Sequence, residues 1–394
     1  MSGFLNEIEL ELNEILDYWT SHAVDEINGG FVGRVSEENN KIHSESKGLI
    51  LNARILWTYS AAFNYTRSPT HFDLARRAFT YLIKYFYDEL NKGFYWLIDK
   101  KGVIIDDKKH IYAQSFVVYG LSEYFKISGD QRALDLAIET YQMIIEKSKD
   151  NELGGFAEAF SNKWESLDDV RLSDKDVNVQ KTMNTHLHIV EAFVTLYSVW
   201  KDKDLKQEII SILYLIEDKF IDESSGHLKL FFDTNWHDYT DIISYGHDVE
   251  AAWLLLQCAE IIQHEDLINR YRNYAILFID SSIIALDGDG GLWYEMELVS
   301  GKLVKEKHWW PQAEFMIGAI NAYELTNDKK YLDLCLKTWN FIKQKIKDPN
   351  GEWHWGIDSV GNIIADKYKI GFWKCPYHST RMCLELLKRL NLKN

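Results

Sequence analysis

A glycine followed within two residues by an aromatic or apolar side chain recurs six times along the chain. Taking Gly30, Gly93, Gly155, Gly226, Gly291 and Gly351 as markers, the intervals are 63, 62, 71, 65 and 60 residues. A nearly fixed period is the signature of a repeat architecture, in which each unit buries its apolar face against its neighbours. The sequence therefore predicts six copies of one structural unit.

Each unit contains the same order of elements. A short alternating apolar segment typical of a hairpin follows the glycine, and two runs at helical spacing come next, separated by a short polar break. The first helices are predicted at 52–65, 112–125, 182–200, 247–262, 311–325 and 376–390. The second helices are predicted at 72–88, 132–147, 205–220, 267–283 and 330–346, so the sixth unit lacks one.

The N-terminal segment supplies the missing helix. Residues 4–22 form an acidic amphipathic pattern, and pairing this helix with the last one would join the two ends of the chain into a ring. We therefore predict an all-α fold, an (α/α)6 barrel with short β-hairpins at the active-site mouth, made by residues 1–394 as one catalytic domain. The alternative is an open helical solenoid of the same repeat type.

Composition limits the partners of this barrel. The chain is 46% hydrophobic and 26% charged, and it contains no run of about eighteen apolar residues, so we expect no membrane association. A formal net charge of −16 repels nucleic acid. The N-terminus lacks the features of a signal peptide and the four cysteines form no CxxC pair, so we expect a cytoplasmic monomer with free thiols.

The starts of the six predicted first helices are unusually polar. In a barrel they would surround one mouth, where polar groups avoid the cost of unpaired burial by facing water or a ligand. They carry Asn52 and Arg54; Tyr112 and Gln114; Asn184, His186 and His188; His247 and Glu250; Trp309, Trp310, Gln312 and Glu314; and Trp373, Tyr377, His378 and Arg381. Six weak signals thus point to one small-molecule site.

Histidines suggest the chemistry of this site. His247 and Glu250 are three residues apart on one helical turn, a spacing at which a carboxylate can orient an imidazole and raise its basicity. Asn184 and His188 share a helix face, whereas His186 points elsewhere and is expected to be structural. Groups that titrate near neutrality favour proton transfer.

Two other site types remain open at this point. His188, His247 and His378 would also suit a metal, and Glu250 with Glu314 would suit glycoside hydrolysis by paired carboxylates. Neither a phosphate-binding GxxxxGK[ST] loop, a GxGxxG turn nor a GxSxG elbow occurs. Nucleotide and nicotinamide cofactors are therefore not indicated, and we expect no cofactor and no metal.

Four ordered motifs resemble those of the N-acylglucosamine 2-epimerase superfamily, and within it the bacterial cellobiose 2-epimerases. The motifs are Met183-Asn184-Thr185-His186-Leu187-His188, Gly246-His247-Asp248-Val249-Glu250, Trp309-Trp310-Pro311-Gln312-Ala313-Glu314 and Trp373-Lys374-Cys375-Pro376-Tyr377-His378. The resemblance covers essentially the whole chain. It departs from the expected pattern at Cys375 and Ser379, beside the last histidine, which bears on substrate preference more than on chemistry.

The resemblance implies a barrel that inverts C2 of the reducing-end glucose of a β-1,4 disaccharide, without cofactor or metal. At the positions that match the family's motifs, the resemblance implies that His247 and His378 are the general acid/base pair and that His188 assists ring opening. The positions implied to bind the small oligosaccharide substrate are Arg54, Tyr112, Asn184 and Glu250 for the hydroxyls, and Trp310 and Trp373 for stacking.

Inversion at C2 of a sugar needs two proton-transfer groups, a role that two histidines can fill. Once the sugar ring is open, a base can remove the C2 proton because the charge spreads onto O1 as an enediolate, and a second group can return a proton to the other face. Return to C1 would give a ketose, so an aldose–ketose isomerase is the alternative. A carbohydrate-binding scaffold and a hydrolase are the remaining readings.

Overall fold

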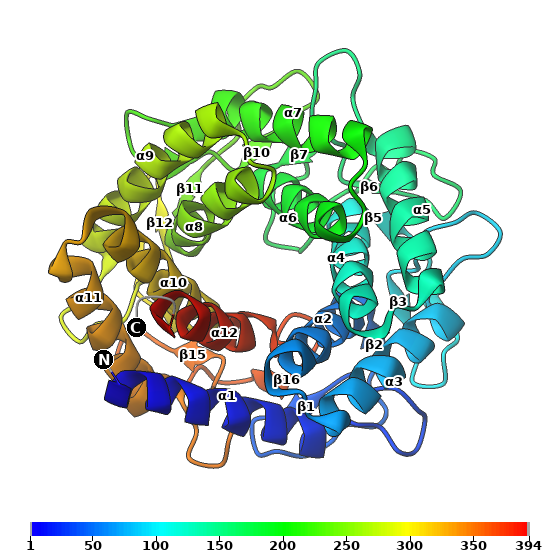
Figure 1. Ribbon diagram of the computed structural model, residues 1–394, viewed down its shortest axis with the longest axis horizontal. Helices are drawn as coiled ribbons and strands as arrows, with labels where there is room; N and C mark the ends of the chain where they lie inside the picture. Colours follow the sequence, from blue (N-terminus) through cyan, green and yellow to red (C-terminus); the bar gives the residue numbers. More distant parts are fainter. Residues whose placement is uncertain (1, 392–394) are drawn as a thin grey trace.

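The computed structural model describes residues 2–391, and its helices form two concentric rings (Figure 1). The inner ring consists of α2 (Leu49–Thr66), α4 (Ile111–Ser128), α6 (Met183–Val199), α8 (Tyr245–Ile261), α10 (Trp309–Thr326) and α12 (Tyr377–Asn391). The outer ring consists of α1 (Ser2–His22), α3 (Pro69–Tyr85), α5 (Gln131–Ser148), α7 (Lys203–Lys219), α9 (Glu265–Ser282) and α11 (Lys329–Phe341).

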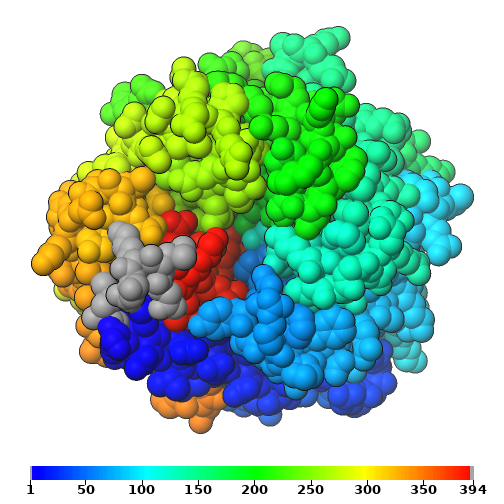
Figure 2. Space-filling view, viewed as in Figure 1, coloured from blue at the N-terminus to red at the C-terminus, as the bar shows by residue number. Residues whose placement is uncertain are grey.

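The ring is closed by the N-terminal helix. Helix α12 packs against α1 on the outside and against α2 and α10 on either side within the inner ring. In the space-filling view the red end of the chain lies beside the blue N-terminal helix (Figure 2). The prediction of a closed (α/α)6 barrel is therefore confirmed, and the open solenoid is excluded.

The two rings differ in burial, as their sequences require. Helix α2 is buried without interruption from Leu49 to Ala62, because it is covered by the outer ring on one side and by the other inner helices on the other. Outer helix α3 buries one stripe of residues, which includes Leu74, Ala78 and Leu82 at helical spacing, and this is the pattern of an amphipathic helix with one face in water.

Helix boundaries agree with the predicted ones to within a few residues, with one exception. The helix predicted at 330–346 ends as an α-helix at Phe341 and continues as a π-helical turn, Ile342–Ile346. The change of hydrogen-bond pattern carries no signal in the apolar spacing of the sequence.

Each unit contains the predicted hairpin, closed by paired strands or by single bridges such as Phe160 with Ser166 and Ile357 with Ile363, but strands also pair between units, which was not predicted. The strand before each inner helix pairs with a strand of the next unit, and the last pair joins the chain ends. The pairs are β2 (Lys47–Gly48) with β3 (Leu97–Ile98), β5 (Lys109–His110) with β6 (Ala159–Phe160), β7 (Lys181–Thr182) with β10 (Phe231–Phe232), β11 (Ile242–Ser244) with β12 (Glu295–Glu297), β14 (Lys307–His308) with β15 (Gly356–Ile357), and β16 (Tyr368–Ile370) with β1 (Val35–Ser36).

Four short strands complete the set: β4 (Ile104–Asp106), β8 (Ile221–Asp222), β9 (His227–Leu228) and β13 (Leu303–Val304). Within the units the glycine turn is closed mostly by single bridges, such as Tyr87 with Phe94 and Lys149 with Phe156. The strands thus connect neighbouring units around the mouth.

The recurring glycine segment has a structural role. In four units the residue one or two positions after the glycine donates its backbone N–H to a polar side chain in the first turn of an inner helix: Phe94 to Gln114, Phe156 to His186, Leu228 to Asp248 and Leu292 to Gln312. Gly155 has a φ of +84°, and a Cβ there would lie 3.0 Å from His186 Nε2. The motif therefore fixes each hairpin to the helix start that it neighbours.

Among the described residues, an ion pair with a buried lysine recurs in five of the six units. Each joins a lysine in the strand before an inner helix to an aspartate ahead of the glycine: Lys47–Asp25, Lys109–Asp88, Lys181–Asp150, Lys307–Asp287 and Lys369–Asp348. The cysteines Cys258, Cys335, Cys375 and Cys383 are buried free thiols, as predicted. Among the described residues, no helix combines the length and apolar character that a bilayer crossing requires.

Candidate active site

Side chains from all six inner helices contact one another near the helix starts. Arg54 of α2 donates to the hydroxyl of Tyr112 of α4 at 2.6 Å. Arg381 of α12 donates to carboxylates of α6, α8 and α10. Residues far apart in the sequence therefore form one polar cluster inside an otherwise apolar ring.

Arg381 is the centre of this cluster. Its Nη1 lies 2.6 Å from Glu191 Oε1, and its Nη2 lies 2.5 Å from Glu250 Oε1 and 2.7 Å from Glu314 Oε1. All four side chains are buried. One guanidinium thus neutralises part of the charge of three carboxylates, and such a buried network is stable only while every member is paired.

His188 is held by Glu191, which follows it by one helical turn. Its Nδ1 donates to Glu191 Oε2 at 2.8 Å, while Tyr377 donates to Glu191 Oε1 at 2.7 Å. Burial works to raise the pKa of Glu191, but the charge of Arg381 and these hydrogen bonds outweigh it and hold that pKa at about 2. An ionised carboxylate only accepts hydrogen bonds, so Nδ1 of His188 carries the proton and Nε2 is left free to react.

His378 has a carboxylate partner from another helix. Its Nδ1 donates to Glu314 Oε1 at 2.7 Å, and Glu314 Oε2 accepts from the indole of Trp253 at 3.0 Å. Burial lowers the pKa of His378 well below its ordinary value, against the opposing charge of Glu250. The ring is therefore neutral at pH 7 and able to accept a proton.

His247 does not have the partner that the sequence predicted. Its Nδ1 lies 2.8 Å from Ser244 Oγ, and Glu250 is bound by Arg381 instead. Arg381 is the stronger competitor because it offers a charged donor to the carboxylate. Burial lowers the pKa of His247 to about 4, although the charge of Glu250 opposes the shift.

The indole of Trp310 lies close to both of these histidines. Its centroid is 4.9 Å from that of His247 and 5.6 Å from that of His378. Gly246 permits this approach, since a Cβ there would lie 2.4 Å from the indole. His247 and His378 therefore face the same small region from α8 and α12.

Arg54 is a buried cation without a carboxylate partner. Within residues 2–391 it forms no ion pair; its contacts are Tyr112, Cys375 Sγ at 3.7 Å, and the ring of Phe116 at 4.1 Å. Its Nε is buried without a hydrogen-bond partner. A buried guanidinium in this state favours an anion or a developing negative charge close to it.

The remaining predicted residues surround the same region. The ring of Tyr112 packs edge-on against that of His188, with 5.0 Å between the ring centroids, and the ring centroid of Trp373 lies 6.5 Å from that of Tyr112. The Oδ1 atom of Asn184 is buried and has no hydrogen-bond partner in the part of the chain that the structure describes. His186 points away and accepts the N–H of Phe156, so its expected structural role is confirmed.

The donor set bears on the metal and hydrolase alternatives. Glu250, Glu314 and His378 place ligand atoms within 4.8 Å of one another, which is close enough for a cation. The guanidinium of Arg381, however, already bridges the two carboxylates, and Glu314 is also bound by Trp253 and His378. Both carboxylates are thus bound to Arg381, and both oxygens of Glu314 are engaged, so this set fits a structural network better than a metal or a glycosidase pair.

Sequence reasoning missed two residues of the site. Glu191 was recognisable, because His188 and Glu191 have the same three-residue spacing as His247 and Glu250. Ser244 lies in the strand before α8, where a serine reads as an ordinary helix cap. Glu314 and Arg381 were expected at the mouth, but nothing local indicated that they bind each other.

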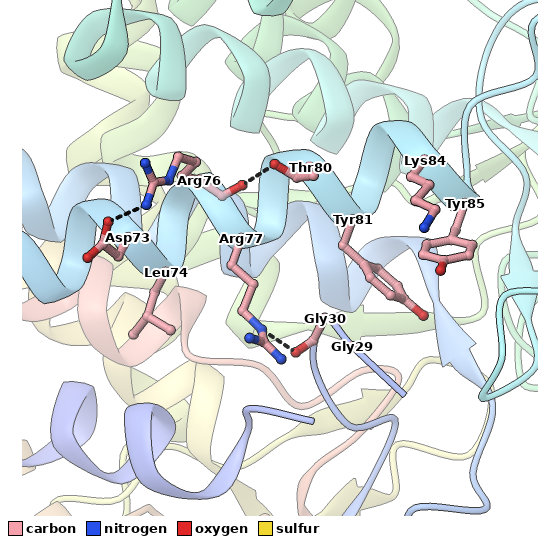
Figure 3. Close-up of a pocket in the computed structure, with 10 residues that line it drawn as sticks. All are labelled: Gly29, Gly30, Asp73, Leu74, Arg76, Arg77, Thr80, Tyr81, Lys84 and Tyr85. Atoms are coloured by element: carbon pink, nitrogen blue, oxygen red, sulfur yellow. Dashed lines mark hydrogen bonds and ion pairs between the residues drawn. The ribbon is translucent and has the colours of Figure 1, made fainter. Parts of the chain in front are cut away.

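A separate surface hollow lies on the outer wall of the barrel. It has a volume of about 560 Å³ and is lined by Gly29, Gly30 and residues of α3, among them Arg77, Tyr81 and Lys84 (Figure 3). Arg77 there donates to the backbone carbonyl of Gly30. This hollow contains none of the histidines described above.

The family model of N-acylglucosamine 2-epimerase matches residues 29–381. The chain is 41% identical to a cellobiose 2-epimerase of Bacteroides fragilis over 97% of this chain and 98% of that protein, and 37% identical to one of Dictyoglomus turgidum over 96% of each. The solved cellobiose 2-epimerase of Bacillus thermoamylovorans B4167 superposes with a TM-score of 0.93 at 37% identity, covering 99% of this chain and 100% of that one. The chain therefore belongs to the N-acylglucosamine 2-epimerase family and is an isomerase that epimerises sugars at C2.

Proposed function

We propose that this enzyme inverts C2 of the reducing-end glucose of cellobiose, and of related β-1,4 disaccharides such as lactose, through an enediolate. The observation that carries the proposal is that His247 and His378 both lie against one indole, while the charge of a buried guanidinium, Arg54, acts on His378 and has no carboxylate partner among the described residues. The disaccharide is inferred from the relatives, whose name is cellobiose 2-epimerase.

Formation of the enediolate uses Arg54 and His188. The sugar ring must open to expose the C1 carbonyl before C2 becomes acidic, and His188 assists this step through its free Nε2. Removal of the C2 proton places negative charge on O1. Arg54 stabilises that charge, because a preorganised cation acts strongly in a site with a low dielectric constant.

Inversion needs proton transfer on both faces of C2. Because burial keeps His247 and His378 neutral at pH 7, either ring can act as the base. Rotation about C2–C3 then presents the other face. The negative charge of the enediolate raises the pKa of the second imidazole, which favours its protonated form and allows it to deliver a proton.

Other residues hold the disaccharide. Tyr112, Asn184 and Glu250 offer a hydroxyl, an amide and a carboxylate to the sugar hydroxyls, while Trp310 and Trp373 provide aromatic faces for stacking. We infer that the whole barrel works as one catalytic unit, since the site draws on all six inner helices.

An aldose–ketose isomerase is the second candidate, because the same enediolate gives a ketose when the proton is delivered to C1. The chain is also 22% identical to a D-mannose isomerase of Marinomonas mediterranea over 98% of its length.

Product analysis separates the candidate functions. The purified protein is incubated with cellobiose without added metal or nucleotide, and the sugars are resolved by chromatography. We expect glucosyl-mannose as the main product. A ketose as the main product would identify the isomerase, free glucose would identify a hydrolase, and unchanged cellobiose would contradict the proposed substrate.

A further inference from the structure

Ser244 occupies a fixed position beside His247. It is the last residue of strand β11, where it pairs with Glu295 of β12, and its side chain is buried. Its Oγ lies 2.8 Å from Nδ1 of His247, one helical turn further along. Strand pairing on one side and the start of α8 on the other therefore hold the hydroxyl at the imidazole.

The Ser244 hydroxyl does not cap its helix, although its position favours capping. Ser244 is the N-cap residue of α8, but its side chain makes no cap hydrogen bond. At the equivalent position of α6, Thr182 accepts the backbone N–H of Thr185. A serine at an N-cap normally stabilises its helix in this way. The hydroxyl of Ser244 instead binds a side chain.

The partner of His247 also differs in kind from those of the other two histidines. His188 and His378 both place Nδ1 against a carboxylate, at 2.8 and 2.7 Å. A carboxylate accepts only, so it fixes the proton on Nδ1 and stabilises an imidazolium. A hydroxyl carries no charge and can donate or accept. It therefore orients the ring of His247 without favouring its protonated form.

We propose that Ser244 is a positioning residue that makes the two acid/base histidines unequal, because a neutral hydroxyl orients His247 whereas a carboxylate orients His378. This inference rests on the proposed function. Both residues would act on the same enediolate, so their difference appears in how that intermediate divides between substrate and product. Loss of the Ser244 hydroxyl removes the orientation of His247 and slows proton transfer on its face of C2 alone.

The test is deuterium uptake in D2O, started once from cellobiose and once from its C2 epimer. Early in the reaction, the ratio of deuterium in recovered substrate to deuterium in product reports the partition of the intermediate. In Ser244→Ala we expect this ratio to change by about 3- to 10-fold, in opposite directions from the two starting sugars. Ser244→Thr, which keeps the hydroxyl, should restore the wild-type ratio.

Two further variants complete the design. Glu314→Gln replaces the carboxylate that holds His378 with a neutral amide. The deuterium ratio of this variant should therefore change in the direction opposite to that of Ser244→Ala. Ser60→Ala is the matched control, since the Ser60 hydroxyl is buried in α2 and, within residues 2–391, bonds only the carbonyl of Leu56. Its ratio should equal that of the wild type.

Two results would overturn the inference. One is a deuterium ratio in Ser244→Ala that equals the wild-type ratio from both starting sugars. The serine would then act only on structure, even if the overall rate or the melting temperature fell. The other is the same direction of change in Ser244→Ala and Glu314→Gln. Absence of deuterium uptake in the wild-type enzyme would instead contradict the proposed function, so the two failures are distinguishable.

Discussion

Replacing His378 with asparagine is expected to lower kcat on cellobiose by about 10²- to 10⁴-fold, the usual loss on removing a general acid or base. The amide of asparagine can still donate to Glu314, which His378 contacts at 2.7 Å, so the buried carboxylate is not left unpaired. Unlike the imidazole, however, the amide cannot take up a proton from C2. Initial rates of epimerisation, together with thermal melting of both proteins, measure the effect.

His186→Gln is the matched control for this loss. His186 is equally buried and lies near His188, but its Nε2 accepts the N–H of Phe156. Gln114 and Gln312 perform that function in other units, so glutamine fits the position. We expect this variant to retain activity within about threefold, since it leaves the acid/base groups in place. A His378→Asn enzyme as active as His186→Gln would show that His378 transfers no proton.

Replacing Arg381 with leucine is expected to lower the free energy of unfolding by about 3–5 kcal/mol, because removing one partner of a buried ionic network leaves uncompensated charge. Here Glu191, Glu250 and Glu314 would lose their shared cation together. Urea unfolding followed by circular dichroism gives the change, provided that the slope with urea stays constant.

Arg389→Leu serves as the comparison on the same helix. Arg389 is partly buried and pairs with Glu385 and Glu324, so its loss is expected to destabilise the protein less than the loss of the fully buried Arg381. Equal destabilisation by the two substitutions would mean that the buried network adds nothing beyond a partly buried ion pair. A stable Arg381→Leu protein would contradict the role assigned to Arg381.

The barrel could be predicted because its signal is repeated. Inner helices such as α2 are buried on every side and outer helices such as α3 are amphipathic, and the repetition of this contrast along the chain reinforces the signal. The pairing of strands between units could not be predicted, since strands such as Lys47–Gly48 are only two residues long. So short a segment has no periodicity of its own.

The site was predictable where a residue's neighbours in sequence are also its neighbours in space. Histidines at helix starts were found in this way. The contact of Arg381 with Glu191 joins residues 190 positions apart, and it depends on ring closure. Glu250 was assigned to His247 for the same reason: local spacing gave no sign that Arg381 would take this carboxylate and leave Ser244 as the partner of the imidazole.

Proton NMR of cellobiose incubated with the enzyme in D2O tests whether two histidines transfer the proton at C2. We expect a mannose-type reducing end that carries deuterium at C2, because the proton returned to the second face of C2 comes from a histidine that exchanges with solvent. A mannose-type product that retains the original hydrogen at C2 would contradict transfer by two histidines.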